Sequence, residues 1–395
     1  MKVCIVSHAY LERGYLPVLE GLAAKPGVEL ALITPASYTL GVQNSSGEFA
    51  ETDGNYRTYP VPIRWRGRQG AFTYHFSGLA KALDEFKPDI IFHEQEVFAL
   101  SALQVTWIAS KRSIPLALQV WENLERKLAP PRQWIRKYVL TRAAGLTTAS
   151  TESCRLHRAW GFKGPIEVIP GMGVDTLNLN PQYGRRNGNT LAVCYAGRLI
   201  PSKGIDTLLK AVATLHSKGI AVRCTIAGRG VEHDRLTAMA GTLRIADVVD
   251  MVGILPSDQV KALLRTSDVL VLPSRRTKVW EEQFGRVLAE AMAEATVTVG
   301  SRTGAIPEVI GNDKLVFEED DHNALSAILE NLATDQTVFE FHQHQLWERA
   351  RNHYVNDILA TRKVRFLREI LESTGHPPVL ADGDLPRKNC AASTR

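Results

Sequence analysis

The segment LAVCYAGRLIPSKG, residues 191–204, contains the pattern on which the fold prediction rests. Its first part, Leu191–Ala196, is a short and almost continuously apolar run, which is typical of a strand buried on both faces. A glycine and two cations follow, and a helical pattern begins after Gly204. A buried strand that leads into a helix predicts a parallel sheet covered by helices, an α/β fold.

The same alternation of apolar runs and helical patterns extends along the whole chain. Helical patterns such as Ala71–Phe86 and Val97–Ser110 separate the runs. We expect strands at Val3–Ser7, Glu29–Thr34, Asp89–His93, Pro115–Val120, Gly145–Ala149, Ile166–Pro170, Leu191–Ala196, Val222–Ala227, Val249–Val252, Asp268–Pro273, Thr296–Gly300 and Leu315–Phe317. A polar stretch divides them into two series, which predicts two Rossmann-like, doubly wound α/β domains.

The same patterns predict the limits of the domains. The first domain spans residues 1–177, a linker covers 178–189, and the second domain spans 190–353. Residues 354–372 have apolar side chains at helical spacing, so we expect a helix that docks back on the first domain. The polar and small residues of 373–395 predict a disordered tail. The expected ligand site is a cleft between the two domains, since ligands bind at the carboxyl ends of parallel strands.

Composition excludes several classes of protein. The 395 residues include 47 Lys and Arg and 42 Asp and Glu, which leaves a net charge of +5. This surplus suits an anionic small molecule or an anionic membrane surface, and it is too small to indicate nucleic acid. The first apolar run is too short for a signal peptide, and we expect no membrane span. We therefore expect a cytoplasmic protein.

Two cations, Arg198 and Lys203, leave the end of strand 191–196 and flank the start of a helix. A planar guanidinium, an ammonium and a helix N-terminus together suit a diphosphate. A solvated turn with two surface cations explains the same residues equally well. The next strand ends in Gly228-Arg229-Gly230, where glycines let the backbone approach a ligand or simply close a turn.

Two carboxylates, Glu282 and Glu290, lie eight positions apart at a helix that is expected from Phe284 onward. Eight helical residues span about 12 Å, which is too far for the acid–base pair of a glycosidase. The two groups could instead hold two ends of one long ligand. Favourable charge at a helix N-terminus also explains Glu282, and a solvated helix face also explains Glu290.

Five segments follow one another in order through the second half of the chain. They are Gly197-Arg198-Leu199 with Lys203-Gly204, Gly228-Arg229-Gly230, Leu272-Pro273-Ser274, Glu282-x-Phe284-Gly285 with Glu290-Ala291-Met292-Ala293, and Gly304-x-x-Pro307-Glu308. In this order they resemble the C-terminal half of glycosyltransferase family 4, the retaining nucleotide-sugar transferases with the GT-B fold. The similarity covers most of residues 165–320, and the N-terminal half is similar only in layout.

The resemblance implies how a donor would be held. Arg198 and Lys203 would bind the donor diphosphate and stabilise it as it leaves, with Gly197 and Gly228 in the same loops. Glu282 would bind hydroxyls of the transferred sugar.

The resemblance also implies how the rest of the nucleotide is bound. Amides near Phe284 and Gly285 would help Glu282, and Glu290 would hold the ribose. The loop at Gly253 and Ile254 would lie near the base. The family needs no metal and no other cofactor, because cationic side chains and helix ends take that place.

The chain departs from the family pattern in two places. The family usually follows Glu-Ala-Met-Ala with a small residue, Gly, an apolar residue and Pro, whereas Glu294-Ala295-Thr296-Val297 stands here. We expect this to alter a turn and not the donor site. The family's N-terminal loop is often Gly-Gly, and only Gly14 remains here.

In this family the first domain binds the acceptor. Two strands of that domain end in polar residues, one in His93 and Glu94 and the other in Trp121 and Glu122. Glu122 could accept a hydrogen bond from the acceptor hydroxyl or from the sugar. For His93, Glu94 and Glu122 alike, a capping or solvated role is about equally consistent with the sequence.

A stretch of cations and aromatic residues also occurs in the first domain. It comprises Arg64-Trp65-Arg66-Gly67-Arg68 and then Arg126, Lys127, Arg132, Trp134, Arg136 and Lys137. On a helix over 132–142 these cations could rest on an anionic membrane. A core-facing helix with a solvated basic face is the alternative explanation.

Together, the resemblance and the residues predict a retaining glycosyltransferase of class EC 2.4. It would move a sugar from a nucleoside-diphosphate sugar to a glycan, lipid-linked or small-molecule acceptor, in cell-surface polysaccharide or glycoconjugate synthesis. A nucleotide-sugar epimerase of the same fold and a catalytically weak sugar-nucleotide-binding subunit are the alternatives. The presence of Arg198, Lys203, Glu282 and Glu290 favours the enzyme.

Overall fold

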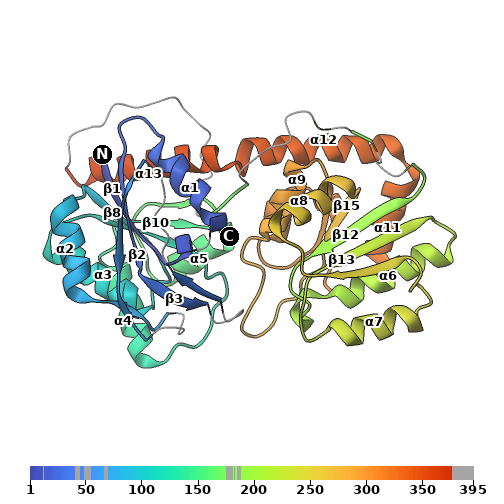
Figure 1. Ribbon diagram of the computed structural model, residues 1–395, viewed down its shortest axis with the longest axis horizontal. Coiled ribbons are helices and arrows are strands. Elements are labelled where there is room, and N and C mark those ends of the chain that lie inside the picture. The colour runs from blue at the N-terminus through green and yellow to red at the C-terminus, as the bar shows by residue number, and fades with distance from the viewer. Residues whose placement is uncertain are drawn as a thin grey trace. The chain divides into compact units, whose positions relative to one another are not determined.

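The computed structural model describes residues 1–11, 13–40, 45–48, 55–65, 70–174, 181, 183–184 and 188–375. Contacts divide the chain into two compact units, one formed by Met1–Met172 with the segment from Asn356 onward, the other by Gly173–Val355. Each unit is a parallel sheet covered by helices (Figure 1). Most of the expected linker, and the expected tail from residue 376, lie outside the described residues.

The first unit contains a seven-stranded sheet with the order β11-β10-β9-β8-β1-β2-β5. Every pairing in it is parallel. The strands are β1 (Lys2–Val6), β2 (Glu29–Pro35), β5 (Arg57–Val61), β8 (Ile90–Glu94), β9 (Leu116–Val120), β10 (Gly145–Thr148) and β11 (Ile166–Val168). The sequence pattern does not predict β5, because this edge strand has only one buried residue and contains a proline.

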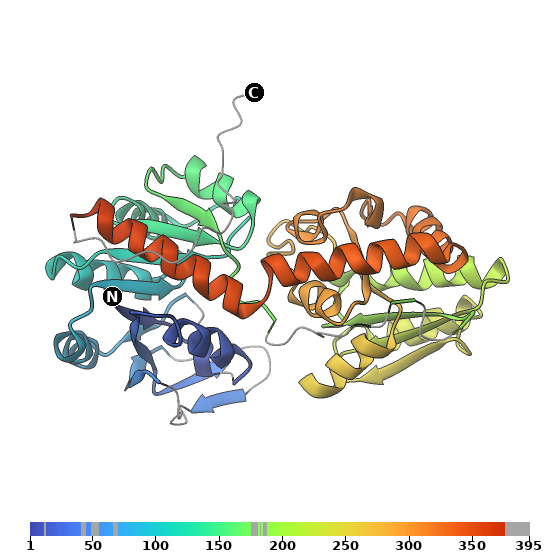
Figure 2. The same ribbon diagram turned by 90° about the horizontal axis from the view of Figure 1, so that it is seen from above.

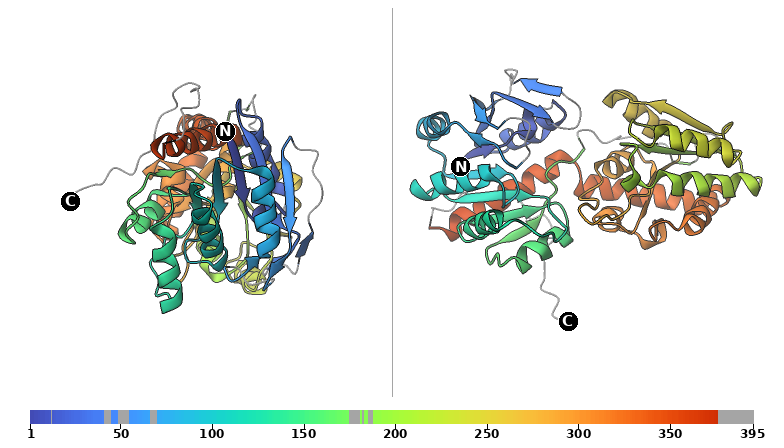
Figure 3. Two further views of the ribbon diagram at one scale, coloured as in Figure 1. Left: turned by 90° about the vertical axis from the view of Figure 1, so that its left-hand side faces the viewer. Right: turned by 90° about the horizontal axis from the view of Figure 1, so that it is seen from below.

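Two helical layers cover this sheet. The helices are α1 (Leu16–Ala23), α2 (Phe76–Phe86), α3 (Leu100–Lys111), α4 (Pro130–Leu140), α5 (Thr151–Ala159) and α13 (Asn356–Ser373). One core joins α2, α3 and α4 to the sheet, and a second core joins α1 and α13 to its other face. Seen from above, α13 lies over the sheet (Figure 2), and seen from below the opposite layer is nearest (Figure 3, right).

Short elements complete the first unit. They are the 3-10 turns Ala9–Leu11 and Arg13–Tyr15, and the antiparallel pairs β3 (Ser37–Leu40) with β4 (Ser45–Glu48) and β6 (Ile63–Arg64) with β7 (Thr73–Tyr74). The expected helix 71–86 therefore begins only at Phe76. Thr73 and Tyr74 belong to a strand instead, which agrees with the β propensity of Thr and Tyr.

The second unit contains a six-stranded parallel sheet with the order β14-β13-β12-β15-β16-β17. Its strands are β12 (Leu191–Ala196), β13 (Val222–Ala227), β14 (Val249–Gly253), β15 (Val269–Leu272), β16 (Val297–Ser301) and β17 (Val316–Phe317). The register places Ala196 beside Ala227, and Leu272 beside Gly300. The carboxyl ends of these strands therefore meet along one edge.

Helices also cover both faces of the second sheet. They are α6 (Ile205–Ser217), α7 (His233–Thr242), α8 (Ser257–Thr266), α9 (Arg286–Ala293), α10 (Ile306–Ile310), α11 (His322–Thr334) and α12 (Gln336–His353), with 3-10 turns at Pro201–Lys203 and Asp313–Leu315. Helices α8, α9 and α12 form one layer, and α6, α7 and α11 form the other (Figure 1). The loops at the carboxyl edge lie between these layers, and they carry the residues considered next.

Candidate active site

The loops that follow β12 and β13 contact each other through their backbones. Gly228 has φ +147°, and a Cβ there would lie 1.8 Å from the carbonyl oxygen of Gly197. The amide of Leu199 donates to the carbonyl of Arg229 at 2.9 Å. The strand-end glycines identified in the sequence therefore allow two loops to pack without side chains between them.

Lys203 and Glu282 form an ion pair at this edge. The Lys203 Nζ lies 2.6 Å from Glu282 Oε2, and the Ser274 hydroxyl donates to the same oxygen at 3.0 Å. Both charged side chains are buried. Gly204, at φ +62°, makes this approach possible, because a Cβ there would lie 2.0 Å from the carbonyl oxygen of Pro273. The structure thus brings together two residues that the sequence places 79 positions apart.

The backbone of Glu282 is held by the loop after β16. Its carbonyl accepts the amide of Ala305 at 2.9 Å. A Cβ on Gly304 would lie 2.0 Å from that carbonyl oxygen. Gly304 therefore serves to position Glu282. This contact links two of the five segments that carry the family resemblance.

Arg275, for which the sequence pattern predicts no role, joins the loop after β15 to the first turn of α6 and to the loop after β17. Its Nη1 lies 2.8 Å from Asp206, its Nη2 donates to Thr207 at 3.0 Å, and it also pairs with Asp320. Burial alone would raise the pKa of Asp206, but the hydrogen bonds from Arg275 hold that pKa below its ordinary value. A loop tied at both sides in this way holds Ser274 and Glu282 in place.

Arg198 and Arg229 are exposed at the same edge. Neither guanidinium has an ion-pair partner among the residues that the structure describes. The Tyr195 hydroxyl donates to the carbonyl of Arg198 at 2.8 Å. Burial and the nearby charge of Glu282 raise the pKa of Tyr195, and Arg198 opposes them. The charges of Arg198 and Glu282 therefore both influence the hydroxyl of Tyr195, which lies near each of them.

Helix α9 begins two residues later than expected. Gly285 is its N-cap with φ +74°, and a Cβ there would lie 3.0 Å from both Leu272 and Leu288. Phe284 precedes the helix and is buried, with its ring 5.7 Å from that of Tyr354. Glu282 therefore lies in the loop before the helix and not at the helix N-terminus, which corrects the sequence prediction. A left-handed glycine cannot occupy a helical position, which is why the helix starts after it.

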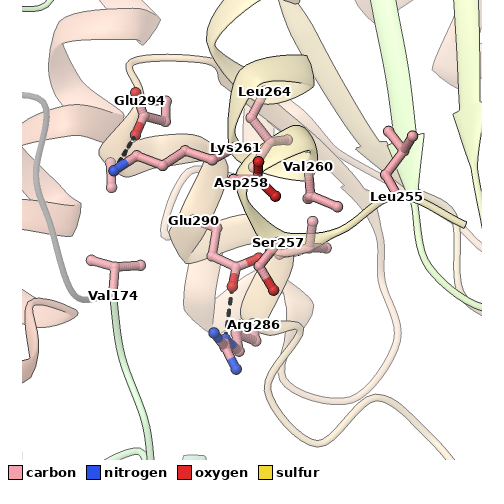
Figure 4. Close-up of a pocket in the computed structure, with 12 residues that line it drawn as sticks. Val174, Leu255, Ser257, Asp258, Val260, Lys261, Leu264, Arg286, Glu290 and Glu294 are labelled. Carbon is pink, nitrogen blue, oxygen red and sulfur yellow. Dashed lines mark ion pairs between the residues drawn. The ribbon is translucent and has the colours of Figure 1, made fainter. Parts of the chain in front are cut away.

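A cavity of about 520 Å³ lies between α8 and α9 (Figure 4). Glu290 and Arg286 face each other in it, with 2.7 Å between Arg286 Nε and Glu290 Oε1. Leu255, which follows Gly253 and Ile254, lines the cavity, and Ile254 itself is 63% exposed. Apolar walls with a few charged groups are typical of a small-molecule site.

The departure from the family pattern at residues 294–297 lies partly in a turn and partly on the wall of this cavity. Glu294 lines the cavity and is buried, with its carboxylate 2.9 Å from Arg265 Nε and 3.5 Å from Lys261 Nζ. In Figure 4, Lys261 extends toward Glu294, away from Glu290. Ala295 adopts φ +57°, a left-handed conformation at the position where the family has glycine.

Several polar residues of the first unit lie at the carboxyl end of its sheet, but they are largely buried. His93 Nδ1 donates to the Val6 carbonyl at 2.7 Å, and burial lowers the pKa of His93 to about 4. Glu94 accepts from the Tyr10 hydroxyl at 3.0 Å and lies 3.7 Å from Lys363 Nζ. Glu122 is buried and pairs with Arg126. Gly14 is exposed in the turn before α1.

Glu96 is a second residue for which the sequence pattern predicts no role. Its Oε1 accepts the backbone amides of Trp121 and Glu122, each at 3.0 Å, and thereby holds the loop after β9. Its Oε2 is out of contact with solvent and has no hydrogen-bond partner among the described residues. Burial raises the pKa of Glu96 to about 7, although the Trp121 amide and the charge of Arg126 oppose that rise.

Helix α4 presents the cations and aromatic rings noted in the sequence. Trp134 is 58% exposed and stacks on Tyr138 at 5.4 Å, and the Arg142 guanidinium lies 3.8 Å from the Tyr138 ring centre. Ile135 and Val139 on the other face are buried. Within the described ranges, none of the helices is long and apolar enough to cross a membrane.

Comparison with known families matches both halves of the chain. The family described as "Glycosyl transferases group 1" matches residues 179–353, and the "Glycosyl transferase 4-like domain" matches residues 13–171.

Individual relatives match over part of the chain. A colanic acid biosynthesis glycosyltransferase of Escherichia coli K12 is 33% identical over 175 residues, which is 43% of each chain. An MMP α-(1→4)-mannosyltransferase of Mycolicibacterium hassiacum is 33% identical over 243 residues, or 56% of each. The chain thus matches about half of the length of these relatives, or less.

Solved structures match over nearly the whole chain. Sucrose-phosphate synthase from Thermosynechococcus elongatus superimposes with a TM-score of 0.69 at 17% identity, covering 94% of this chain and 100% of that one. Anabaena Alr3699/HepE, solved in complex with UDP and glucose, has a TM-score of 0.67 at 16% identity, covering 93% and 100%. The two matched domains and these folds show that the chain belongs to the group 1, or family 4, glycosyltransferases and has the α/β domains of the GT-B fold.

Proposed function

We propose that the protein is a retaining glycosyltransferase that moves a sugar from a nucleoside-diphosphate sugar to a glycan, lipid-linked or small-molecule acceptor. The observation that carries the proposal is the buried pair of Lys203 and Glu282, 2.6 Å apart at the carboxyl edge of the second sheet. The loop that supplies Glu282 continues into α9, and α9 supplies Glu290 to the neighbouring cavity. A cation, a carboxylate for the sugar and a cavity large enough for a nucleoside thus follow one another along this edge. A nucleotide sugar has its diphosphate, sugar and nucleoside to be bound by such groups.

Each part of the donor has a proposed partner. Arg198 and Lys203 bind the diphosphate, Arg198 because it is exposed at the loop end without an ion-pair partner in the described part of the chain. Glu282 binds sugar hydroxyls. Glu290 binds the hydroxyls of the ribose, which replace its ion pair with Arg286. The base lies against the loop at Gly253 and Ile254.

In the proposed reaction, the acceptor attacks the sugar from the same face as that from which the diphosphate departs. The acceptor oxygen forms a bond to the anomeric carbon as the bond from that carbon to the diphosphate oxygen breaks, and the departing diphosphate takes the acceptor's proton. Arg198 and Lys203 stabilise the charge that develops on the diphosphate. Glu282 Oε2 already accepts two hydrogen bonds, which supports a holding role over a nucleophilic one.

The relatives suggest which donors and pathways to test first. One relative is named for colanic acid biosynthesis and another for mannosyl transfer, and structural neighbours are described with UDP and glucose or with UDP and GlcNAc. A role in cell-surface polysaccharide or glycoconjugate synthesis, with UDP- or GDP-sugars as donors, is the proposal that these names support.

A ligand and turnover screen tests the function. UDP, GDP, ADP and their common sugars are screened by thermal shift, and each sugar nucleotide that binds is assayed for release of free nucleoside diphosphate. Arg198→Ala and Lys203→Ala should each lower turnover roughly 10²-fold or more, because each removes charge that the transition state needs. Near-normal turnover in both folded variants contradicts the donor site. Binding without turnover supports the sugar-nucleotide-binding subunit, and a new sugar epimer on the nucleotide supports the epimerase.

We further propose that the protein acts on the cytoplasmic face of a membrane, through weak peripheral contact. The support is α4 with the turn after it, where Trp134 and Tyr138 are flanked by Arg132, Lys137 and Arg142. No acidic residue occurs between Glu125 and Glu152. Such a surface fits anionic headgroups.

Sedimentation with vesicles tests this contact. Phosphatidylglycerol vesicles should retain the protein at low salt and release it at high salt, because surface charges are screened. Replacing Lys137 and Arg142 by Gln should reduce retention, and replacing Lys210 and Lys278 of the second unit should not. Equal retention by neutral phosphatidylcholine vesicles contradicts the membrane contact and leaves the transferase proposal intact.

A further inference from the structure

Trp280 borders the ion pair of the candidate active site. Its ring centre lies 4.5 Å from Lys203 Nζ, and that ammonium lies 2.6 Å from Glu282 Oε2. The indole is partly open to solvent, whereas Lys203 and Glu282 are buried beside it. An aromatic face therefore flanks the place where the two charged groups meet.

The loop before Trp280 is built to hold the indole there. The amide of Thr277 donates to the carbonyl of Trp280 at 2.8 Å, and the amide of Trp280 donates to the Thr277 hydroxyl at 2.9 Å. Arg276 Nε lies 3.4 Å from Glu281, and the Arg276 amide donates to Glu319 at 3.1 Å. The turn is thus closed by its own hydrogen bonds and anchored on both sides of the indole.

If the proposed function holds, the donor diphosphate competes with Glu282 for the Lys203 ammonium. The diphosphate then takes Lys203, and sugar hydroxyls take Glu282, so the atoms that join them lie beside Trp280. An indole face offers such a ligand two interactions. It attracts the Lys203 ammonium, and it provides an apolar surface against which C–H groups of a sugar ring can pack.

We propose that Trp280 is a donor-binding residue whose indole packs against the transferred sugar and steadies the Lys203 ammonium when Glu282 turns to that sugar. This inference rests on the proposed function. It also commits to a class of sugar, because the face of an aromatic ring is electronegative and disfavours a carboxylate. The transferred sugar is accordingly a neutral pyranose and not a uronic acid.

The test compares a sugar nucleotide with the bare nucleotide. Calorimetry measures binding of UDP-glucose and UDP, and of GDP-mannose and GDP, to the wild-type protein, and the pair that binds is carried forward. Trp280→Leu should weaken the sugar nucleotide about tenfold, and the free diphosphate at most about threefold through Lys203. Trp280→Phe, which keeps an aromatic face, should stay within about threefold for both.

The matched control is Trp107→Leu in α3. Trp107 is also partly exposed and lies 6.0 Å from a lysine, Lys111, but it belongs to the first unit. This variant should bind both probes as the wild type does. UDP-glucuronate should bind the wild type more weakly than UDP-glucose, and Trp280→Leu should narrow that difference.

The possible results separate this inference from the function beneath it. If the wild-type protein binds neither pair, the proposed function is wrong and this inference is wrong with it. If the wild type binds a sugar nucleotide and Trp280→Leu binds it equally well, this inference alone is wrong. Should Trp280→Leu fail to fold, the decisive readout is tryptophan emission. The sugar nucleotide should change it in the wild type, and in Trp280→Phe that change should be lost.

Discussion

Glu282 and Glu290 differ in their surroundings, and the difference predicts different consequences of the same substitution. Glu282 is buried against Lys203 and Ser274, whereas Glu290 faces a cavity and pairs with Arg286. Glu282→Gln should lower turnover and leave the affinity for free nucleoside diphosphate nearly unchanged, because that product carries no sugar. Glu290→Gln should weaken nucleotide binding itself, by roughly 1.5–3 kcal/mol if it loses charged hydrogen bonds.

Calorimetry with the nucleoside diphosphate, combined with initial rates, distinguishes the two variants. Glu330→Gln is a matched control, because Glu330 is a carboxylate that pairs with Lys218 on the surface, away from these loops. Equal loss of diphosphate affinity in Glu282→Gln and Glu290→Gln contradicts the division of roles.

Glu96 predicts a specific dependence of stability on pH. Burial raises its pKa from 4.5 to about 7, so the folded state holds a proton that the unfolded state releases. The free energy of unfolding should therefore fall as pH rises from about 4.5 to about 7 and level off above, a total of roughly 3 kcal/mol. Glu96→Gln cannot release this proton and should lose that part of the pH dependence.

Denaturant unfolding at pH 5 and pH 8 measures this effect as a difference between wild type and variant. Contributions of His8, His93 and His157, whose pKa values burial lowers to about 4, are common to both proteins and cancel. Glu152→Gln, at an exposed position in α5, serves as the control. An unchanged difference between the two pH values means that Glu96 does not hold the proton.

At the scale of elements, the strand-end loops pack closely where a glycine lies against the backbone carbonyl of a neighbouring loop. Gly304 and Gly219 both have positive φ, at +51° and +75°. A Cβ on Gly304 would lie 2.0 Å from the Glu282 carbonyl oxygen, whereas nothing lies within 4 Å of one on Gly219. Gly219→Ala should cost only the left-handed conformation, about 1 kcal/mol. Gly304→Ala should cost clearly more, because the loop bearing Glu282 must move.

Thermal unfolding and turnover measure the two variants side by side. Gly304→Ala should lose turnover even at a temperature where it is fully folded, since Glu282 no longer meets Lys203 in the same geometry. Gly219→Ala should keep wild-type turnover at that temperature. Equal turnover in the two folded variants contradicts the positioning role of Gly304.

For the whole molecule, the prediction is retention of anomeric configuration. Inversion requires a base on the far side of the sugar from the leaving group, and retention through a covalent intermediate requires a nucleophilic carboxylate there. Glu282 is bound to Lys203 and Ser274, which fits a residue that holds the sugar. Proton NMR of the first product formed from an α-linked donor should show an α-linked product, and a β-linked product contradicts the proposed reaction.

Trapping experiments separate the two routes to retention. Same-face attack predicts that no sugar becomes covalently attached to Glu282 when a fluorinated donor is supplied, as mass spectrometry of the intact protein would show. A glycosyl adduct on Glu282 would still agree with retention of configuration, but it would make Glu282 the nucleophile and not a residue that holds the sugar.

The sequence alone was sufficient to predict two series of parallel strands along the chain. All twelve expected strands start within one residue of the observed start and lie in two parallel sheets. Strands of a buried parallel sheet are continuous apolar runs, and the glycine and polar residues between the runs make them easy to recognise. The sequence also placed Arg198 and Lys203 directly after a strand end, since parallel strands direct their carboxyl ends to one edge. It put Glu282 at a helix N-terminus, whereas the structure has it in the loop before α9. The edge strand β5 was missed because a strand with one buried residue lacks that apolar run.

Only the tertiary structure decided which of these residues touch. The bond between Lys203 and Glu282 spans 79 positions, the tie of Arg275 to Asp206 spans 69, and the ion pair of Arg362 in α13 with Glu167 spans 195. Glu96 has no local pattern that would announce a raised pKa, because burial by distant segments causes it. Local sequence determines strands, helices and turns through short-range geometry, whereas contacts between charges depend on how those elements pack, and that packing is absent from any single stretch of the chain.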